Sequence, residues 1–111
     1  SIILEMTLVQ AVDKWLDSLN VRDKTLESYH WSINHLYDYM DKGTPVASIK
    51  TQHVTDYRKY LIDVKGLSPN SVNIALGTLI TLFIWLERHE YINKKPIILV
   101  MRINIIMKVN T

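Results

Sequence analysis

The apolar residues between positions 8 and 19 recur at intervals of three and four, which is the spacing of one face of an α-helix. Thr7 precedes this run, and Gln10 follows Thr7 by three residues; such a pair satisfies two backbone donors at a helix start. We therefore predict a first helix from Leu8 to Leu19, with its charged side chains on the outer face.

The same spacing predicts a second helix from Asp23 to Lys42, ended by Gly43. Trp31 lies off its apolar stripe, on a face with Ser28, His35 and Asp38. A surface aromatic, a partner contact and a DNA-proximal side chain are all open for Trp31, but we expect it to be buried against the first helix or the N-terminal segment. The predicted stripe consists of Leu26, Tyr29, Ile33, Leu36, Tyr37 and Met40.

A third helix is expected with Thr51 as its N-cap and Gly66 as its stop, and with Val54, Tyr57, Leu61 and Val64 on its buried face. Ser68 followed by Pro69 predicts the start of a fourth helix that continues to Arg88 or Glu90. No segment shows sustained strict alternation, so the predicted fold class is all-α, a four-helix bundle with short loops.

The fourth helix is apolar around most of its circumference, unlike the other three. Such a helix either lies at the centre of a domain or is covered by another molecule. Ile80, Ile84 and Trp85 are therefore candidates for an interface with a partner domain or subunit. The alternative is a central helix over which the C-terminal tail packs, and the sequence favours neither.

Composition narrows the class of protein. A chain of 111 residues has room for one domain with one core. It has no cysteine, and its four histidines lack metal-ligand spacing, so we expect neither a metal nor a cofactor. The net charge of +2 does not by itself indicate a nucleic-acid partner. No targeting signal or membrane span is expected, and the composition fits the cytoplasm.

Two junctions between loop and helix resemble each other. Residues 21–26 open the second helix and residues 67–72 open the fourth. Each has an apolar residue, three polar or turn residues, a hydroxyl residue (Thr25 or Ser71) and then the first core residue. The two predicted helix starts therefore carry similar side chains.

A set of short motifs follows in a fixed order along most of the chain, from Met6 to Ile98. In chain order they are Lys24-Thr25-Leu26 with Tyr29, Ile49 with Thr51, Gly66-Leu67-Ser68 with Ser71-Val72-Asn73, the aromatic-rich run 82–86, Tyr91-Ile92 and Pro96. In this order the chain resembles the N-terminal SAM-like, or core-binding, domain of the tyrosine recombinase (phage integrase) family.

The resemblance implies a helical module that covers one face of duplex DNA, while a separate catalytic domain of the parent recombinase covers the other. Its partners would be double-stranded DNA, that catalytic domain and further copies of itself on DNA. Helix N-termini, which carry free N–H groups and partial positive charge, suit phosphate. The DNA-binding residues expected from these two arguments are Lys24, Thr25, Ser28, Ser68, Asn70, Ser71, Asn73, Lys94 and Lys95.

Gly77 lies on a polar strip of the fourth helix with Asn70 and Asn73. The absence of a side chain at Gly77 would admit either a DNA backbone or a neighbouring helix.

The His-x-x-Arg motif of the family's catalytic domain does not occur in this sequence. None of the four histidines has arginine three residues later; the occupants are Ile33, Asp38, Asp56 and Ile92. We therefore expect no catalytic residue and no enzyme activity in this chain, which would serve DNA integration or excision by binding alone.

The expected layout is a lead-in over residues 1–6, a core-binding domain over 7–96 and an apolar tail or truncated linker over 97–111. The tail departs from the family, which usually has Asn-Pro and then a basic stretch where this chain has Lys94, Lys95 and Pro96 followed by apolar residues. The rival hypothesis is a helical protein-interaction module that docks through the fourth helix. A small transcription regulator is disfavoured, because no helix-turn-helix with a basic recognition helix stands out.

Overall fold

The first helix begins where the sequence predicts it. In the computed structural model, which describes residues 6–92, α1 spans Leu8–Ser18. The Gln10 N–H donates to the Thr7 hydroxyl (3.3 Å), and the Thr7 N–H donates to the side-chain oxygen of Gln10 (3.0 Å). The predicted pair of capping bonds is thus confirmed. The N–H groups of Leu8 and Val9 donate to the carbonyls of Thr44 and Lys42, so a distant loop completes this helix start.

That loop explains why the second helix is shorter than predicted. α2 spans Asp23–Tyr39, and Met40 is already extended, with φ −121° and ψ 132°. The chain then runs beside the start of α1, where Thr7 and Pro45 form an isolated antiparallel bridge. The prediction that α2 continues to Lys42 is wrong, because the carbonyls of residues 42 and 44 serve α1 instead. A short 3₁₀ turn, η1 (Val46–Ser48), follows.

The third helix, α3, spans Thr51–Asp63. Its N-cap is Lys50 rather than Thr51, and the Lys50 N–H donates to the imidazole Nδ1 of His53 (2.8 Å). The prediction that Val64 lies in the buried face is also wrong, because the helix ends one residue earlier and Val64 is 70% exposed. Gly66 has a φ of +66°, in the left-handed region that favours glycine, and it turns the chain toward the fourth helix.

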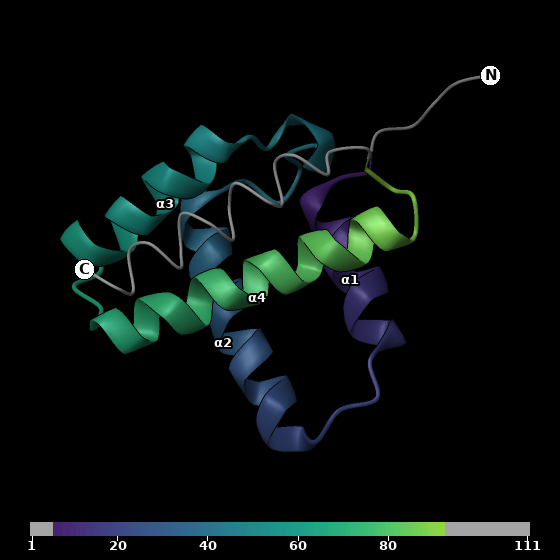
Figure 1. Ribbon diagram of the computed structural model, residues 1–111, viewed down its shortest axis with the longest axis horizontal. Coiled ribbons are helices and arrows are strands. Elements are labelled where there is room, and N and C mark those ends of the chain that lie inside the picture. Colours follow the sequence, from purple (N-terminus) through teal and green to yellow (C-terminus); the bar gives the residue numbers. More distant parts are fainter. Residues whose placement is uncertain (1–5, 93–111) are drawn as a thin grey trace.

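The fourth helix, α4, spans Pro69–Arg88 and packs against the other three helices (Figure 1). Nine of its residues are buried, which accounts for its apolar circumference. By length and composition alone this helix could also cross a membrane, but its contacts are those of the core helix of a bundle. The predicted all-α fold is confirmed, and residues 6–92 contain no strand.

The core joins all four helices. Its largest fully buried side chains include Trp15 of α1, Leu36 of α2, Tyr57 of α3 and Phe83 of α4. One polar contact lies inside it: the Thr78 hydroxyl of α4 donates to the Ser32 hydroxyl of α2 (3.1 Å). The Ser32 hydroxyl itself donates to the Ser28 carbonyl (3.0 Å), so both buried hydroxyls have partners.

Candidate functional site

The start of α2 has no side-chain cap. Its N-cap is Arg22, which makes no capping hydrogen bond, and the first turn contains the acidic residue Asp23. Lys24 is exposed, whereas Thr25 and Ser28 are half-buried. Of the residues predicted to bind DNA, these three therefore lie on two consecutive turns of a helix whose first N–H groups receive no bond from a side-chain cap. The carboxylate of Asp23 also interacts favourably with that helix start and would compete with a phosphate there.

The start of α4 is capped by its own side chains. The Ser71 N–H donates to the Ser68 hydroxyl (3.3 Å), and the Ser68 hydroxyl lies 3.2 Å from that of Ser71. Pro69 is at the first helical position, where its missing N–H costs nothing. Asn70 is exposed and Asn73 is half-buried, and neither amide makes a hydrogen bond among the described residues that would tie it to the fold.

These two helix starts are held apart by the crossing of α2 and α4. Ser32 and Thr78, which meet at the crossing, each lie nine residues from the first residue of their helix. Nine residues of α-helix rise about 13 Å, so each helix start lies about that far from the crossing. Figure 1 shows the first turns of α2 projecting below α4, while α4 begins at the left. We call the part of each helix before the crossing an arm: residues 23–31 of α2 and residues 69–77 of α4. The structure thus places the predicted DNA-binding residues of α2 on one arm and those of α4 on the other, and not in one cluster.

An ion pair shows which side of α2 faces the connection into α4. The Lys65 ammonium lies 2.8 Å from the Asp38 carboxylate, and Lys65 is four residues before Pro69. The hydrogen bond from Lys65 and its positive charge hold the pKa of Asp38 below its usual value, and the same hydrogen bond raises the pKa of Lys65. The side of α2 that carries Asp38 therefore faces the connection that leads into α4.

Sequence reasoning missed an exposed tryptophan on that side of α2. Trp31 was expected to be buried, but 37% of it is exposed. Its ring meets the edge of His35, with 4.5 Å between ring centroids and 71° between ring planes. The prediction is wrong because α2 buries its other side, where it packs mainly on α4 and where the Tyr29 ring lies 4.8 Å from that of Trp15. The signal was present in the sequence, since Trp31 falls outside the apolar stripe of the helix.

The predicted partner interface on α4 divides into a buried and a half-exposed part. Ile80 is only 9% exposed, whereas Ile84 and Trp85 are half-buried. The Trp85 ring lies 4.5 Å from that of His89 and 5.6 Å from that of Tyr91. The central position of α4 agrees with one of the two alternatives for this helix. The C-terminal tail, which that alternative expects to pack over α4, lies outside the described residues, and so do Lys94 and Lys95.

Gly77 is not required by packing within the described bundle, because a Cβ added there would meet no atom within 4 Å.

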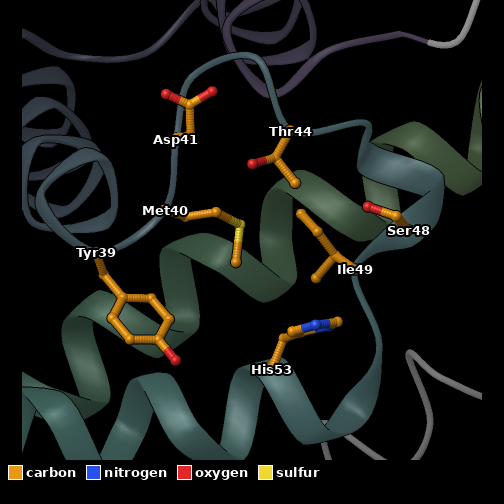
Figure 2. A pocket seen from close by; sticks show the side chains of 7 residues that line it. All are labelled: Tyr39, Met40, Asp41, Thr44, Ser48, Ile49 and His53. Atoms are coloured by element: carbon orange, nitrogen blue, oxygen red, sulfur yellow. The ribbon is translucent and has the colours of Figure 1, made fainter.

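An open pocket of about 420 Å³ lies between the end of α2, the loop after it and the start of α3. In Figure 2, Met40, Ile49 and His53 converge on it, while the carboxylate of Asp41 points away. Three of its polar side chains already serve the backbone: Asp41 accepts from the Gly43 N–H (3.0 Å), His53 accepts from the Lys50 N–H, and the Ser48 hydroxyl donates to the Pro45 carbonyl. We therefore assign this pocket to the structure of the loop and not to chemistry.

The tyrosines of α3 belong to the packing of the bundle. Tyr57 is buried, and its ring lies 5.2 Å from Tyr39 and 6.4 Å from Tyr60. Burial raises the pKa of the Tyr57 phenol far above its usual value, which is the reverse of what a nucleophile needs. Among residues 6–92 no group of three His, Cys, Asp or Glu side chains is placed to hold a metal ion.

The charges of the described domain are nearly balanced. Of the 13 Lys and Arg residues of the chain, Lys94, Lys95, Arg102 and Lys108 lie beyond residue 92, whereas Glu5 is the one acidic residue outside the described range. The weakly positive total charge therefore does not come from the helices. Any affinity of the four helices for DNA must come from where particular groups stand and not from a broad basic surface.

Comparison with known families agrees with this fold. The model of the phage integrase N-terminal SAM-like domain matches residues 8–93, which include all four helices, and the chain belongs to that family. The resemblance seen in the motif order is thereby confirmed. The match is to the N-terminal domain of integrases and not to their catalytic domain. No curated protein and no solved structure matches the chain.

Proposed function

We propose that this chain is the DNA-binding module of a tyrosine recombinase, which holds duplex DNA in the cytoplasm during integration or excision. In this proposal a separate catalytic domain of the parent recombinase cuts and rejoins the strands. The observation that carries it is the start of α2 in a member of the integrase family: a helix N-terminus without a side-chain cap, beside an exposed lysine.

Within this proposal the predicted residues have different tasks. Lys24 contacts phosphate, and Thr25 and Ser28 offer hydroxyl groups on the following turn. Asn70 and Asn73 can donate to DNA from the start of α4. Ser68 mainly caps α4, because its hydroxyl accepts from the Ser71 N–H, and the Ser71 hydroxyl accepts from that of Ser68. Lys94 and Lys95 would follow the DNA backbone into the catalytic domain, and copies of the chain would assemble on DNA.

The test is binding of the full 111-residue chain to a fluorescein-labelled duplex, followed by anisotropy over a series of salt concentrations. We expect weak binding that falls steeply as salt rises, because each phosphate contact releases a counterion. Binding that does not depend on salt, or none at low millimolar protein in low salt, would contradict the proposal.

A second candidate is a protein-interaction module that docks through the end of α4. It is favoured by the ring cluster of Trp85, His89 and Tyr91, of which Tyr91 is exposed. Sedimentation velocity would then show self-association that Trp85→Asp abolishes. Val64→Asp, which places the same charge on an exposed valine of another surface, should leave it unchanged.

A further inference from the structure

Trp31 differs from the other two tryptophans in its exposure. Trp15 is buried in the core and Trp85 is half-buried within a ring cluster, whereas Trp31 presents 37% of its surface to solvent. Along α2 it follows Lys24 by seven residues and Ser28 by three, so the three side chains lie on one face of the helix. An exposed tryptophan thus continues the stripe that begins with the proposed phosphate contact.

The ring of Trp31 packs against His35, on the face of α2 that also carries Asp38. His35 meets the indole edge-on, one turn further along α2, and Asp38 on the following turn pairs with Lys65. Because Lys65 leads into α4, this face of α2 is directed toward the N-terminal arm of α4. The indole is therefore presented in the angle between the two arms.

The facing arm also carries an exposed apolar side chain near the crossing. Ile74 is 41% exposed and lies one turn before Thr78, whose hydroxyl is also 3.2 Å from the Ile74 carbonyl. Trp31 immediately precedes Ser32, the partner of Thr78 at the crossing. Each arm therefore has an exposed apolar residue within one turn of the crossing.

We propose that Trp31, supported by Ile74, forms an apolar contact with bases and deoxyribose of DNA bound between the two arms. This inference rests on the proposed function and adds to it a contact that does not depend on charge. Lys24 stands about 10 Å from Trp31 along the helix axis, so a phosphate held at the helix start leaves the indole beside the sugars and base edges. Apolar side chains contact the thymine methyl group in the major groove and the sugar–base surface of opened steps.

DNA is the occupant favoured here because the apolar pair is continuous with the stripe of Lys24 and Ser28. A protein surface would have to cover Lys24 together with Asp23 and Glu27 on the adjoining face of α2. Burial of three such charges without partners is costly.

The experiment measures duplex binding by the full chain over a series of salt concentrations, for the wild type, Trp31→Ala, Trp31→Phe and Ile62→Ala. Ile62 is a matched control, since it is exposed to a similar extent but lies on α3. We expect Trp31→Ala to raise Kd about tenfold, which is in the range that the loss of contact with one base pair of a duplex costs. The salt slope should stay that of the wild type, because no phosphate contact is lost. Ile62→Ala should bind as the wild type does.

Trp31→Phe is the conservative variant that keeps the test valid if Trp31→Ala does not fold. It keeps an aromatic ring and should bind within about threefold of the wild type. In the wild type we expect DNA to quench tryptophan emission, and in Trp31→Phe we expect that quenching to be lost. If Trp31→Ala folds and binds DNA with unchanged affinity, or if emission is not quenched, the inference is overturned and the proposed function stands. If the wild type binds no duplex at all, the proposed function fails first. If Trp31→Ala changes self-association and not DNA affinity, the surface binds protein and the inference is again wrong.

Discussion

The starts of α2 and α4 look alike in sequence and differ in structure. When residues 21–26 are laid over residues 67–72, Arg22 takes the place of Ser68 and Lys24 that of Asn70. Ser68 accepts a hydrogen bond from the first turn of α4, whereas Arg22, which has no side-chain acceptor, caps nothing. One helix start is satisfied by its own residues and the other is not.

This difference separates stability from binding. A helix start that its own side chains cap needs no outside acceptor, so Ser68 and Ser71 mainly stabilise α4. The start of α2 keeps unsatisfied donors beside a lysine, which is the arrangement that suits a phosphate. Similar local sequences at two helix ends therefore need not have the same role, and the following changes test whether they do.

The largest effect is expected on the free energy of unfolding, at the crossing of α2 and α4 where Thr78 meets Ser32. Thr78→Ala removes a buried methyl group and the hydroxyl that donates to Ser32, and should lower the free energy of unfolding by about 2 kcal/mol. Thr81→Ala is the control, because Thr81 is exposed on the same helix and its hydroxyl donates to the Gly77 carbonyl of that helix. Urea unfolding followed by circular dichroism measures both. Equal effects of the two changes would show that the crossing bond contributes nothing.

The next effect concerns the cap of α4. Ser68→Ala should cost about 1 kcal/mol of stability, as loss of a serine N-cap does. Arg22→Ala, at the matching position of α2, should cost nothing measurable because that side chain makes no cap. Thermal unfolding distinguishes them, with a shift of about 4–8 °C expected for Ser68→Ala in a domain of this size. A comparable loss in both variants would contradict the difference between the two helix starts.

A smaller effect is expected on DNA binding. Lys24→Ala should raise Kd about threefold and reduce the salt slope by about one, as loss of one phosphate contact does. Asn70→Ala, at the equivalent position of α4, carries no charge and should leave the slope unchanged. Anisotropy titrations of both variants at several salt concentrations provide the measurement. If the slope is the same in Lys24→Ala as in the wild type, this lysine does not contact phosphate.

The smallest effect is expected for the ion pair that directs α2 toward α4. The pKa of Asp38 is lowered in the folded state, mainly by the hydrogen bond from Lys65. The pair's contribution is therefore fully present above the pKa of an unfolded aspartate, about 4, and is lost as pH falls through the lower folded value. Asp38→Asn should narrow the difference between urea midpoints at neutral and acidic pH only slightly, because the pair is exposed. A variant more sensitive to acid than the wild type would reverse this sign.

Much of the fold could be predicted because its signals are local. The pair Thr7 and Gln10 fixed the start of α1, and Ser68 with Pro69 fixed that of α4. Helix periodicity identified most of the core, including Trp15 and Leu36. The same rules placed Val64 in the core and extended α2 to Lys42, and both predictions failed where the chain leaves the helix to meet other elements.

The candidate site was predicted in part. Lys24, Thr25, Ser28, Asn70 and Asn73 are at or near the surface of their helix starts, as expected, but whether they bind DNA stays a prediction. Trp31 was misplaced although it falls outside the apolar stripe of α2, because the pattern of a single helix does not show how far the neighbouring helices reach around it. The angle that separates the two arms depends on a contact between residues 46 positions apart, which no local pattern contains.

The sequence by itself determined the number of helices, the caps of α1 and α4 and the family, because capping and periodicity act over a few residues and the motif order can be read directly. It also determined that Ser68 can cap a helix start and that Arg22 cannot. Only the tertiary structure decided that the carbonyls after Tyr39 serve α1, that Trp31 is exposed, and that the two similar helix starts lie on separate arms. Each of these follows from packing between segments distant in the chain, where the gain in burial and hydrogen bonding outweighs the local preference.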